Sequence, residues 1–222
     1  MQRLRVKYAK RGRARFTSHR DFGRAFERAL RRAGVPMAYS SGFSPHPRIS
    51  YANASPTGAA SEAEYLEIGL SARCDPDRVR EALDAALPPG LDIVDVVTSP
   101  PGALADLLTG SRWQVDLVGV GTDVIERAVA AFLAQEAVLV NRMTKSGLRS
   151  FDARPAVRVL TPIEGGLLLV VRHQEPLVRP DDVLQALGAL EPAFAPAEVP
   201  ILTRLTQGQL DPVSGEITEP PG

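Results

Sequence analysis

The chain has 222 residues, enough for one or two domains, and its 26 Lys and Arg balance 26 Asp and Glu. No apolar run reaches the 18 residues that a membrane-spanning helix requires, and a single cysteine, Cys74, excludes an internal disulfide and a Cys-rich metal site. The charge is unevenly distributed, because residues 1–50 hold 13 Lys and Arg against only Asp21 and Glu27. Such a basic segment suggests an anionic partner, and nucleic acid is the first candidate. The single cysteine favours a cytoplasmic protein. No membrane partner is expected, because there is no long apolar run.

An alternating pattern opens the chain. Residues 3–8 alternate between apolar side chains and Arg3, Arg5 and Lys7, which predicts a strand with one buried and one basic face. Residues 13–16 continue the alternation after a turn, either as the same bent strand or as the second strand of a hairpin.

A helix with two unlike faces is expected next. Ser18 is the predicted N-cap, with Asp21 three residues later, and the helix ends near Ala33. Apolar residues recur at helical spacing on one side, and arginines occupy the other. The remaining elements up to residue 98 are predicted as strands at 35–39, 49–53, 64–71 and 91–97 and a helix that starts near residue 75.

The same order of elements is expected to repeat after a linker that contains one helical turn at 103–108. The repeat consists of strands at 113–117, 137–144, 166–173 and 199–205, helices that start at 123 and 180, and an extra extended piece at 154–160. We therefore predict an α+β fold of two tandem ferredoxin-like (split βαβ) domains, each a four-stranded antiparallel sheet with two helices on one face. Their bounds are 1–98 and 112–206, with a linker at 99–111 and a flexible C-terminal tail at 207–222.

The first predicted site is a basic face that combines the strand with the helix. Arginine suits phosphate because its planar guanidinium donates two parallel hydrogen bonds. The side chains expected to hold phosphates are Arg3, Arg5, Arg13, Arg15, Arg24, Arg28, Arg31 and Arg48. The alternatives are a solvated helix face, an acidic protein partner, and neutralisation by the protein's own carboxylates, with Glu62, Glu64 and Glu67 as candidates.

The second predicted site is the loop from Tyr39 to Arg48, which is rich in Ser, Gly and Pro. Tyr39, Phe43 and His46 offer rings to unpaired bases. The alternative is that Phe43 fills the core and the prolines only stiffen a crossover. A basic segment from 142 to 154, with Arg142, Lys145, Arg149 and Arg154, is either a further RNA contact or a solvated hairpin.

Two histidines raise the alternative of catalysis. A metal-independent RNA endonuclease needs a base for the 2′-hydroxyl and an acid for the leaving oxygen, and His46 and His19 are the candidates. Nothing in the sequence brings the two within reach, so we favour a binding protein over an enzyme. His173 lies on an apolar strand and is expected to be structural. No P-loop and no zinc-binding spacing occurs, so no cofactor and no metal are predicted.

Several stretches of the chain resemble a known family. They are residues 15–21, 28–33 and 36–50, then Gly58, Ser61, Glu64 and Tyr65, and more loosely Lys145, Gly147, Asp152, Arg154 and Pro155. These stretches are similar to the radical SAM-linked (radical SAM-associated) proteins, a bacterial family of unknown function. Arg20 departs from the family pattern, in which Leu is usual, and makes the start of the helix more basic.

The resemblance implies an accessory role. Members of that family occur alone or as the C-terminal part of a radical SAM protein, often encoded near a ribonuclease of the E/G type. The chain resembles a stand-alone member, which implies a separate radical SAM enzyme as partner, since one cysteine cannot hold an iron–sulfur cluster. We expect an RNA-binding module that presents tRNA or rRNA to that enzyme for modification. An adaptor that meets the enzyme without contacting RNA is the remaining alternative.

Overall fold

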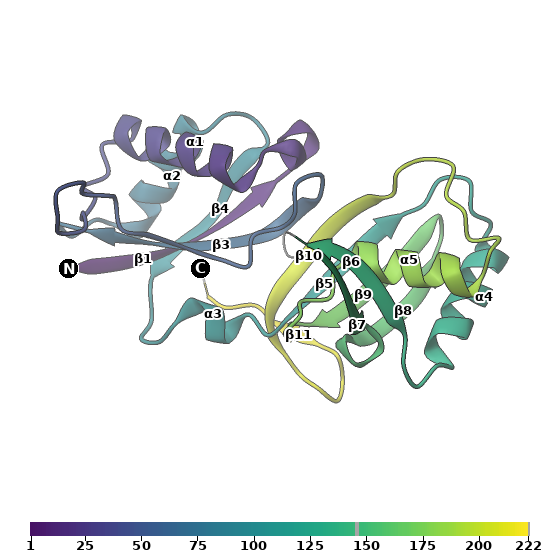
Figure 1. The fold of residues 1–222 in the computed structure, drawn as a ribbon. Helices are drawn as coiled ribbons and strands as arrows, with labels where there is room; N and C mark the ends of the chain where they lie inside the picture. The colour runs from purple at the N-terminus through teal and green to yellow at the C-terminus, as the bar shows by residue number, and fades with distance from the viewer. Residues whose placement is uncertain (145–146, 222) are drawn as a thin grey trace. The chain divides into compact units, whose positions relative to one another are not determined.

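The computed structural model of the protein describes residues 1–144 and 147–221 (Figure 1). The chain forms two compact units, one made of Met1–Leu108 with the segment that starts at Glu219, the other of Thr109–Thr218. Each unit combines an antiparallel sheet with helices, so the protein has an α+β fold. Within the described residues no helix is long and apolar enough to cross a membrane.

Four strands form the sheet of the first unit. Its elements are β1 (Gln2–Lys10), the 3-10 helix η1 (Gly12–Phe16), α1 (His19–Arg32), β2 (Ile49–Ala52), β3 (Ala60–Leu70), α2 (Pro76–Ala86), β4 (Leu91–Thr98) and α3 (Leu104–Leu107). The strands lie in the order β4-β1-β3-β2, and every neighbouring pair is antiparallel. The elements expected up to residue 98 therefore follow one another in the predicted order, apart from the strands expected at 13–16 and 35–39.

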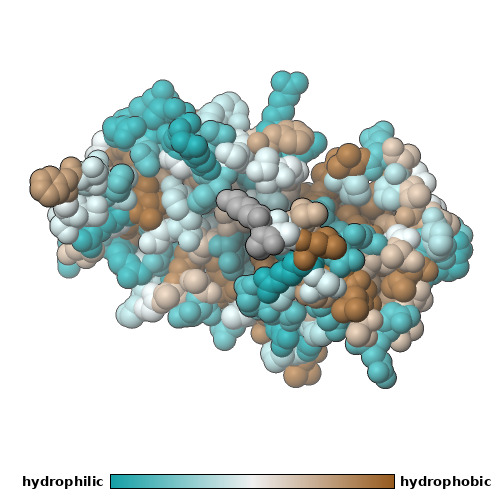
Figure 2. Space-filling model, viewed as in Figure 1, coloured by the Kyte–Doolittle hydropathy of each residue, from teal (hydrophilic) through white to brown (hydrophobic). Residues whose placement is uncertain are grey.

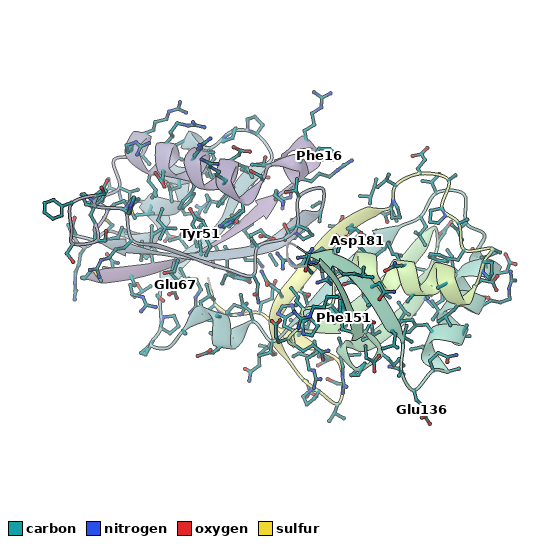
Figure 3. All side chains as sticks on the ribbon, in the orientation of Figure 1. Phe16, Tyr51, Glu67, Glu136, Phe151 and Asp181 are labelled. Atoms are coloured by element: carbon teal, nitrogen blue, oxygen red, sulfur yellow. The ribbon has the colours of Figure 1, made fainter. Side chains whose placement is uncertain are left out.

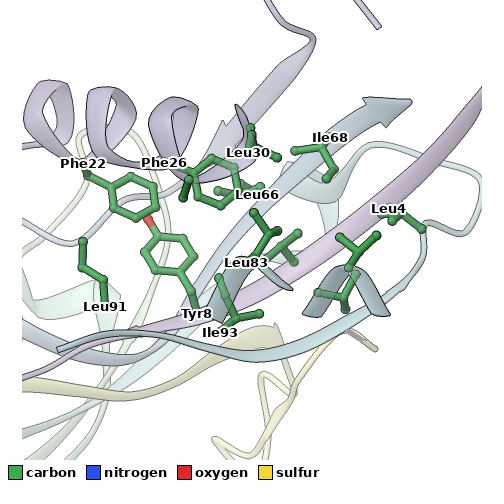
Figure 4. Close-up of a cluster of buried hydrophobic side chains, with 14 of the residues drawn as sticks. Leu4, Tyr8, Phe22, Phe26, Leu30, Leu66, Ile68, Leu83, Leu91 and Ile93 are labelled. Carbon is green, nitrogen blue, oxygen red and sulfur yellow. The ribbon is translucent and has the colours of Figure 1, made fainter. Parts of the chain in front are cut away.

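The core of the first unit lies between this sheet and the helices α1 and α2 (Figure 4). Leu4, Val6 and Tyr8 of β1 are buried there, and the Tyr8 ring stacks on Phe22 of α1 with 4.3 Å between centroids. Ser18 caps α1 as predicted, because its hydroxyl accepts the backbone N–H of Asp21 at 3.2 Å. Side chains alternate along a strand, so the basic residues of β1 point to the opposite face of the sheet.

Residues 35–39 do not form the expected strand. They make only isolated bridges, Met37 with Leu70 and Tyr39 with Pro47. Pro36 and Pro47 have no backbone N–H, so this stretch cannot complete a hydrogen-bonded ladder.

The second unit also contains antiparallel strands of a sheet. Its elements are β5 (Gly110–Asp116), α4 (Thr122–Leu133), β6 (Leu139–Thr144), β7 (Gly147–Asp152), the 3-10 helix η2 (Arg154–Ala156), β8 (Val157–Ile163), β9 (Gly166–Arg172), α5 (Pro180–Leu190), β10 (Ile201–Leu210) and β11 (Ile217–Thr218). The order is β10-β5-β9-β8, and each neighbouring pair is antiparallel.

The second strand of this sheet differs from the prediction. Residues 137–144 were expected to provide it, but β6 pairs only with β7, in a separate two-stranded hairpin. The strand beside β9 is β8, which corresponds to the extended piece expected at 154–160. The physical reason is burial: Val157 and Leu160 of β8 are buried, whereas Leu139 and Met143 of β6 are largely exposed.

The expected linker and tail are both structured. Leu104 and Leu108, inside the predicted linker, are buried against Ala52, Ala63 and Tyr65 of the first unit. In the predicted tail, β10 continues to residue 210, β11 pairs with β10, and Pro220 is buried. The helical turn expected at 103–108 is present as α3, whereas the strand pairing and burial between residues 207 and 220 differ from the expected flexible tail, because apolar side chains between the prolines and glycines pack.

We predict that Phe26→Ala destabilises the first unit by about 3–5 kcal/mol, because the Phe26 side chain of α1 is fully buried against the sheet. Phe16→Ala, which removes an exposed ring at the end of η1, should change stability by less than about 0.5 kcal/mol. Urea unfolding followed by circular dichroism measures both. Equal losses for the two variants would contradict this packing.

Candidate nucleic-acid interface

Helix α1 carries a row of exposed arginines on the side that faces away from the core. These are Arg20, Arg24, Arg28, Arg31 and Arg32. Two carboxylates lie on the same helix: Asp21 is 3.9 Å from Arg24, and Glu27 is 4.0 Å from Arg31. Exposed pairs at this distance contribute little, and no described carboxylate pairs with the other three arginines. Helix α1 therefore keeps most of its positive charge toward solvent, where Figure 2 shows a hydrophilic surface.

The 3-10 helix η1 extends this surface. Arg13 is exposed, and the guanidinium of Arg15 lies 4.6 Å from the centre of the Phe16 ring, which is itself 59% exposed (Figure 3). The prediction of a strand at 13–16 is wrong, because these residues form a 3-10 helix. The strand pattern placed Phe16 on a buried face, so it was not identified from the sequence as an accessible ring. The available signal was Gly12, whose φ of +52° turns the chain out of β1. We call the seven arginines of η1 and α1 the helical arginine surface.

The basic residues of β1 do not belong to that surface. We call Arg3, Arg5 and Lys7 the strand cation row; it lies on the sheet face opposite α1. Arg3 Nη2 is 2.5 Å from Glu67 Oε2, and Arg5 Nη2 is 3.2 Å from Glu67 Oε1. Arg5 is only 1% exposed, and Lys7 Nζ lies 2.7 Å from Glu219 Oε2. The single basic face expected from strand and helix is therefore wrong, because the sheet separates the two groups and carboxylates neutralise the first.

The carboxylates of β3 take the alternative role that the sequence allowed. Glu67 joins Arg3 and Arg5 and accepts a further hydrogen bond from Ser99 Oγ. Glu62 pairs with Arg11, which also reaches Asp92 at 2.9 Å. Glu64 accepts the backbone N–H of Ser55 at 3.0 Å. Glu67 is thus paired with arginines of β1 and Glu62 with the arginine that follows this strand, whereas no described carboxylate pairs with Arg20, Arg28 or Arg32 of α1.

A cavity of about 880 Å³ adjoins the loop of residues 39–48. Arg3, His46 and Arg48 line it together with β2, β3 and the α3 segment. Arg48 Nε donates to the Tyr39 carbonyl at 3.3 Å, and a Cβ at position 69 would lie 3.2 Å from Arg48 Cβ. Gly69 therefore lets the loop lie against β3. The volume is typical of a ligand site, and three of the predicted contact residues meet there.

The two other aromatic candidates of this loop lie outside the cavity lining. Phe43 is fully exposed, which excludes the alternative that it fills the core. Tyr39 is half exposed, and its backbone bridges to Pro47. An exposed ring at the tip of a loop is available for stacking but not preorganised for it.

The two catalytic candidates are held by different neighbours. His19 packs edge-on against Tyr51 with 4.7 Å between ring centroids, while His46 donates its backbone N–H to Ser40 Oγ at 3.0 Å. No contact between the two imidazoles is present among the described residues. Burial, then the charge of Glu27, raises the pKa of Tyr51 to about 12, so Tyr51 stays protonated beside His19. No group of three His, Cys, Asp or Glu in the described part of the chain is arranged to hold a metal ion.

The second basic segment is largely occupied within its own unit. Arg142 pairs with Asp182, and Arg149 lies 3.4 Å from Glu175. Arg154 donates to the carbonyls of Leu133 and Gln135 at 3.3 and 3.1 Å. Lys145 lies outside the described residues. Carboxylates and carbonyls of the second unit thus hold the arginines of this segment. His173 contacts Ser111 Oγ at 2.9 Å.

These features define an α+β protein with an exposed arginine-rich helix and a loop-bounded cavity. A family described as an uncharacterized protein conserved in bacteria (DUF2344) matches residues 3–180, so the chain belongs to that family. No curated protein matches the chain. Membership confirms the bacterial family of unknown function that the sequence indicated, while the link to radical SAM enzymes stays a prediction.

Glu67→Gln should destabilise the protein by about 3 kcal/mol, because it leaves the buried Arg5 without a carboxylate. The matched control is Glu62→Gln on the same strand, whose pair with Arg11 is exposed and should contribute less than about 1 kcal/mol. Urea unfolding measures both. Similar losses of unfolding free energy in the two variants would show that burial does not determine how much these ion pairs stabilise the protein.

The same network predicts sensitivity to acid. Burial alone raises the pKa of Glu67, but hydrogen bonds from Ser99 and Arg3 outweigh it and hold this pKa below its ordinary value of 4.5. Because this pKa is lowered on folding, the ionised carboxylate stabilises the fold fully above the ordinary value of 4.5. This stabilisation is lost as the pH falls from 4.5 through the pKa of the folded state. We expect the urea midpoint of the wild type to fall more steeply below pH 4.5 than that of Glu67→Gln. Parallel curves would contradict the assignment.

Proposed function

We propose that the protein is an RNA-binding module that contacts the phosphate backbone through the helical arginine surface. The observation that carries this proposal is the contrast within one unit: the strand cation row is paired with carboxylates, whereas η1 and α1 carry six exposed arginines and the half-buried Arg15 beside two carboxylates. Unpaired arginines that lie close together repel one another and destabilise the folded state. An external anion that binds them explains why they cluster on one element.

Nucleic acid fits this surface better than a compact anion does. Arginines recur once per helical turn along α1, and a polyanion can contact several of them at once while releasing its counterions. Phe16 lies exposed beside Arg15, and aromatic rings interleaved with arginines are typical of proteins that stack unpaired bases. These two features favour single-stranded or looped RNA over an acidic protein.

The loop and cavity are the proposed site for bases. Arg48 and His46 line the cavity, and Phe43 and Tyr39 are exposed along the same loop. A base that leaves its stack can enter a cavity of this size, while the exposed rings contact its neighbours. In this arrangement His46 recognises a base rather than acting as a catalytic acid or base.

The remaining parts of the proposal rest on the resemblance to radical SAM-linked proteins. They are that the bound RNA is tRNA or rRNA, and that it is presented to a separate radical SAM enzyme that modifies it. The lone cysteine of these residues cannot supply the several thiolates that a radical SAM cluster needs, so the cluster lies outside them. We further propose that both units are ferredoxin-like domains, since each sheet has the antiparallel order expected of a split βαβ plan. In the second unit the β6–β7 hairpin is then an insertion.

We predict that Arg24→Glu/Arg28→Glu weakens RNA binding at least about tenfold and lowers the slope of log K against log salt by about two. Fluorescence anisotropy with a labelled single-stranded RNA across a salt series measures both quantities. The wild type itself should bind more weakly as salt increases. An affinity indifferent to salt and to this double substitution would overturn the proposal.

The matched control is Arg73→Glu/Arg78→Glu, which reverses the same number of exposed arginines in the first unit. Arg78 lies on α2 among Asp75, Asp77 and Glu81, so its surroundings are already acidic. This control should change RNA affinity by less than about twofold. An equal loss in both variants would mean that net charge, not the helical arginine surface, governs binding.

A further inference from the structure

The end of the described chain lies on the strand cation row. Residues from Glu219 onward belong to the first unit, although the preceding β11 belongs to the second. Glu219 Oε2 is 2.7 Å from Lys7 Nζ, and the Pro221 carbonyl accepts from Arg5 Nη1 at 3.2 Å. Pro220 between them is buried. The segment 219–221 thus places a carboxylate and a carbonyl on two cations of the sheet face that α1 and α2 leave uncovered.

The charge balance of this face depends on the segment. The strand cation row has three cations, and the strands themselves supply one paired carboxylate, Glu67, to Arg3 and Arg5. Glu219 is the only described carboxylate paired with Lys7. Removal of the segment therefore leaves Lys7 without a carboxylate and one guanidinium nitrogen of Arg5 without its carbonyl.

The contact is incompletely satisfied. Tyr65, almost fully buried, lies beside Glu219, and burial followed by the charge of Glu219 raises the pKa of its hydroxyl. Neither the Tyr65 hydroxyl nor Glu219 Oε1 completes a hydrogen bond of normal geometry with the described residues. The two groups face each other with poor hydrogen-bond geometry, and a poorly aligned hydrogen bond is weaker than the regular ones of the surrounding strands.

We infer that the segment 219–221 is an intramolecular competitor, and that the surface under it, formed by Arg5, Lys7 and Tyr65, is a second contact for the RNA backbone. The inference rests on the proposed function. A phosphate has the charge to replace Glu219 on Lys7, and a second phosphate oxygen replaces the Pro221 carbonyl on Arg5. The Tyr65 hydroxyl, which lies against Glu219 in the occupied state, can then donate to a phosphate oxygen instead. Binding in full therefore requires the segment to leave, and the apparent affinity is reduced by the fraction of molecules in which it is bound.

The test compares two single substitutions that change the charge equally. Glu219→Gln removes the carboxylate from Lys7, whereas Glu216→Gln removes an exposed carboxylate a few residues earlier that makes no ion pair with the described residues. We expect Glu219→Gln to bind a labelled single-stranded RNA about three- to tenfold more tightly than Glu216→Gln, with a salt slope larger by about one. Circular dichroism and the urea midpoint check that both variants are folded.

A double-mutant cycle locates the effect. In the Lys7→Gln background, Glu219→Gln should no longer increase RNA affinity, because both the competing carboxylate and the proposed phosphate contact act on Lys7. Equal affinities of Glu219→Gln and Glu216→Gln, or a gain that survives Lys7→Gln, would overturn the inference. If RNA binding is still lost in Arg24→Glu/Arg28→Glu, only the competitor fails; if no variant binds RNA, the proposed function fails as well.

Discussion

The alternation of side chains along β1 decides where the charges of the first unit lie. Leu4, Val6 and Tyr8 are buried against α1 and α2, so Arg3, Arg5 and Lys7 must emerge on the other face of the sheet. A cation such as Arg5, once buried, requires a carboxylate, which β3 supplies with Glu67 directly opposite in the strand register. One strand thereby divides the basic segment into an internally paired group and a solvent-facing group.

This division gives the two groups different tasks. The paired group holds β1, β3, the segment after β4 and the end of the chain together through Glu67, Ser99 and Glu219. The solvent-facing group on η1 and α1 adds little to stability, because its ion pairs are long and exposed. Charge that does not stabilise the fold remains available for a ligand. The cavity beside the loop adds a concave surface on which His46 and Arg48 meet Arg3.

Much of the first unit could be predicted from local patterns. The period of two at residues 3–8, the period of 3.6 between Ser18 and Ala33 and the Ser18 cap each depend on neighbours in the sequence, and the structure confirms them. The assignment of the strand at 137–144 failed because β6 and β8 are both plausible strands by composition. Only pairing with β9 distinguishes them, and that pairing is not local. The prolines of the linker and tail concealed segments whose apolar side chains are buried by residues far away in the chain.

The sequence by itself determined the α+β class, the amphipathic helix and the concentration of arginines before residue 50, because these follow from composition and short-range periodicity. It also indicated that the chain belongs to a bacterial family of unknown function. Only the tertiary structure decided which arginines remain unpaired. The carboxylates that neutralise the strand cation row come from β3 and from the end of the chain, at 62 or more positions away in the sequence. Charge pairing at that separation depends on which strands become neighbours, and a count of charges along the chain does not contain that information.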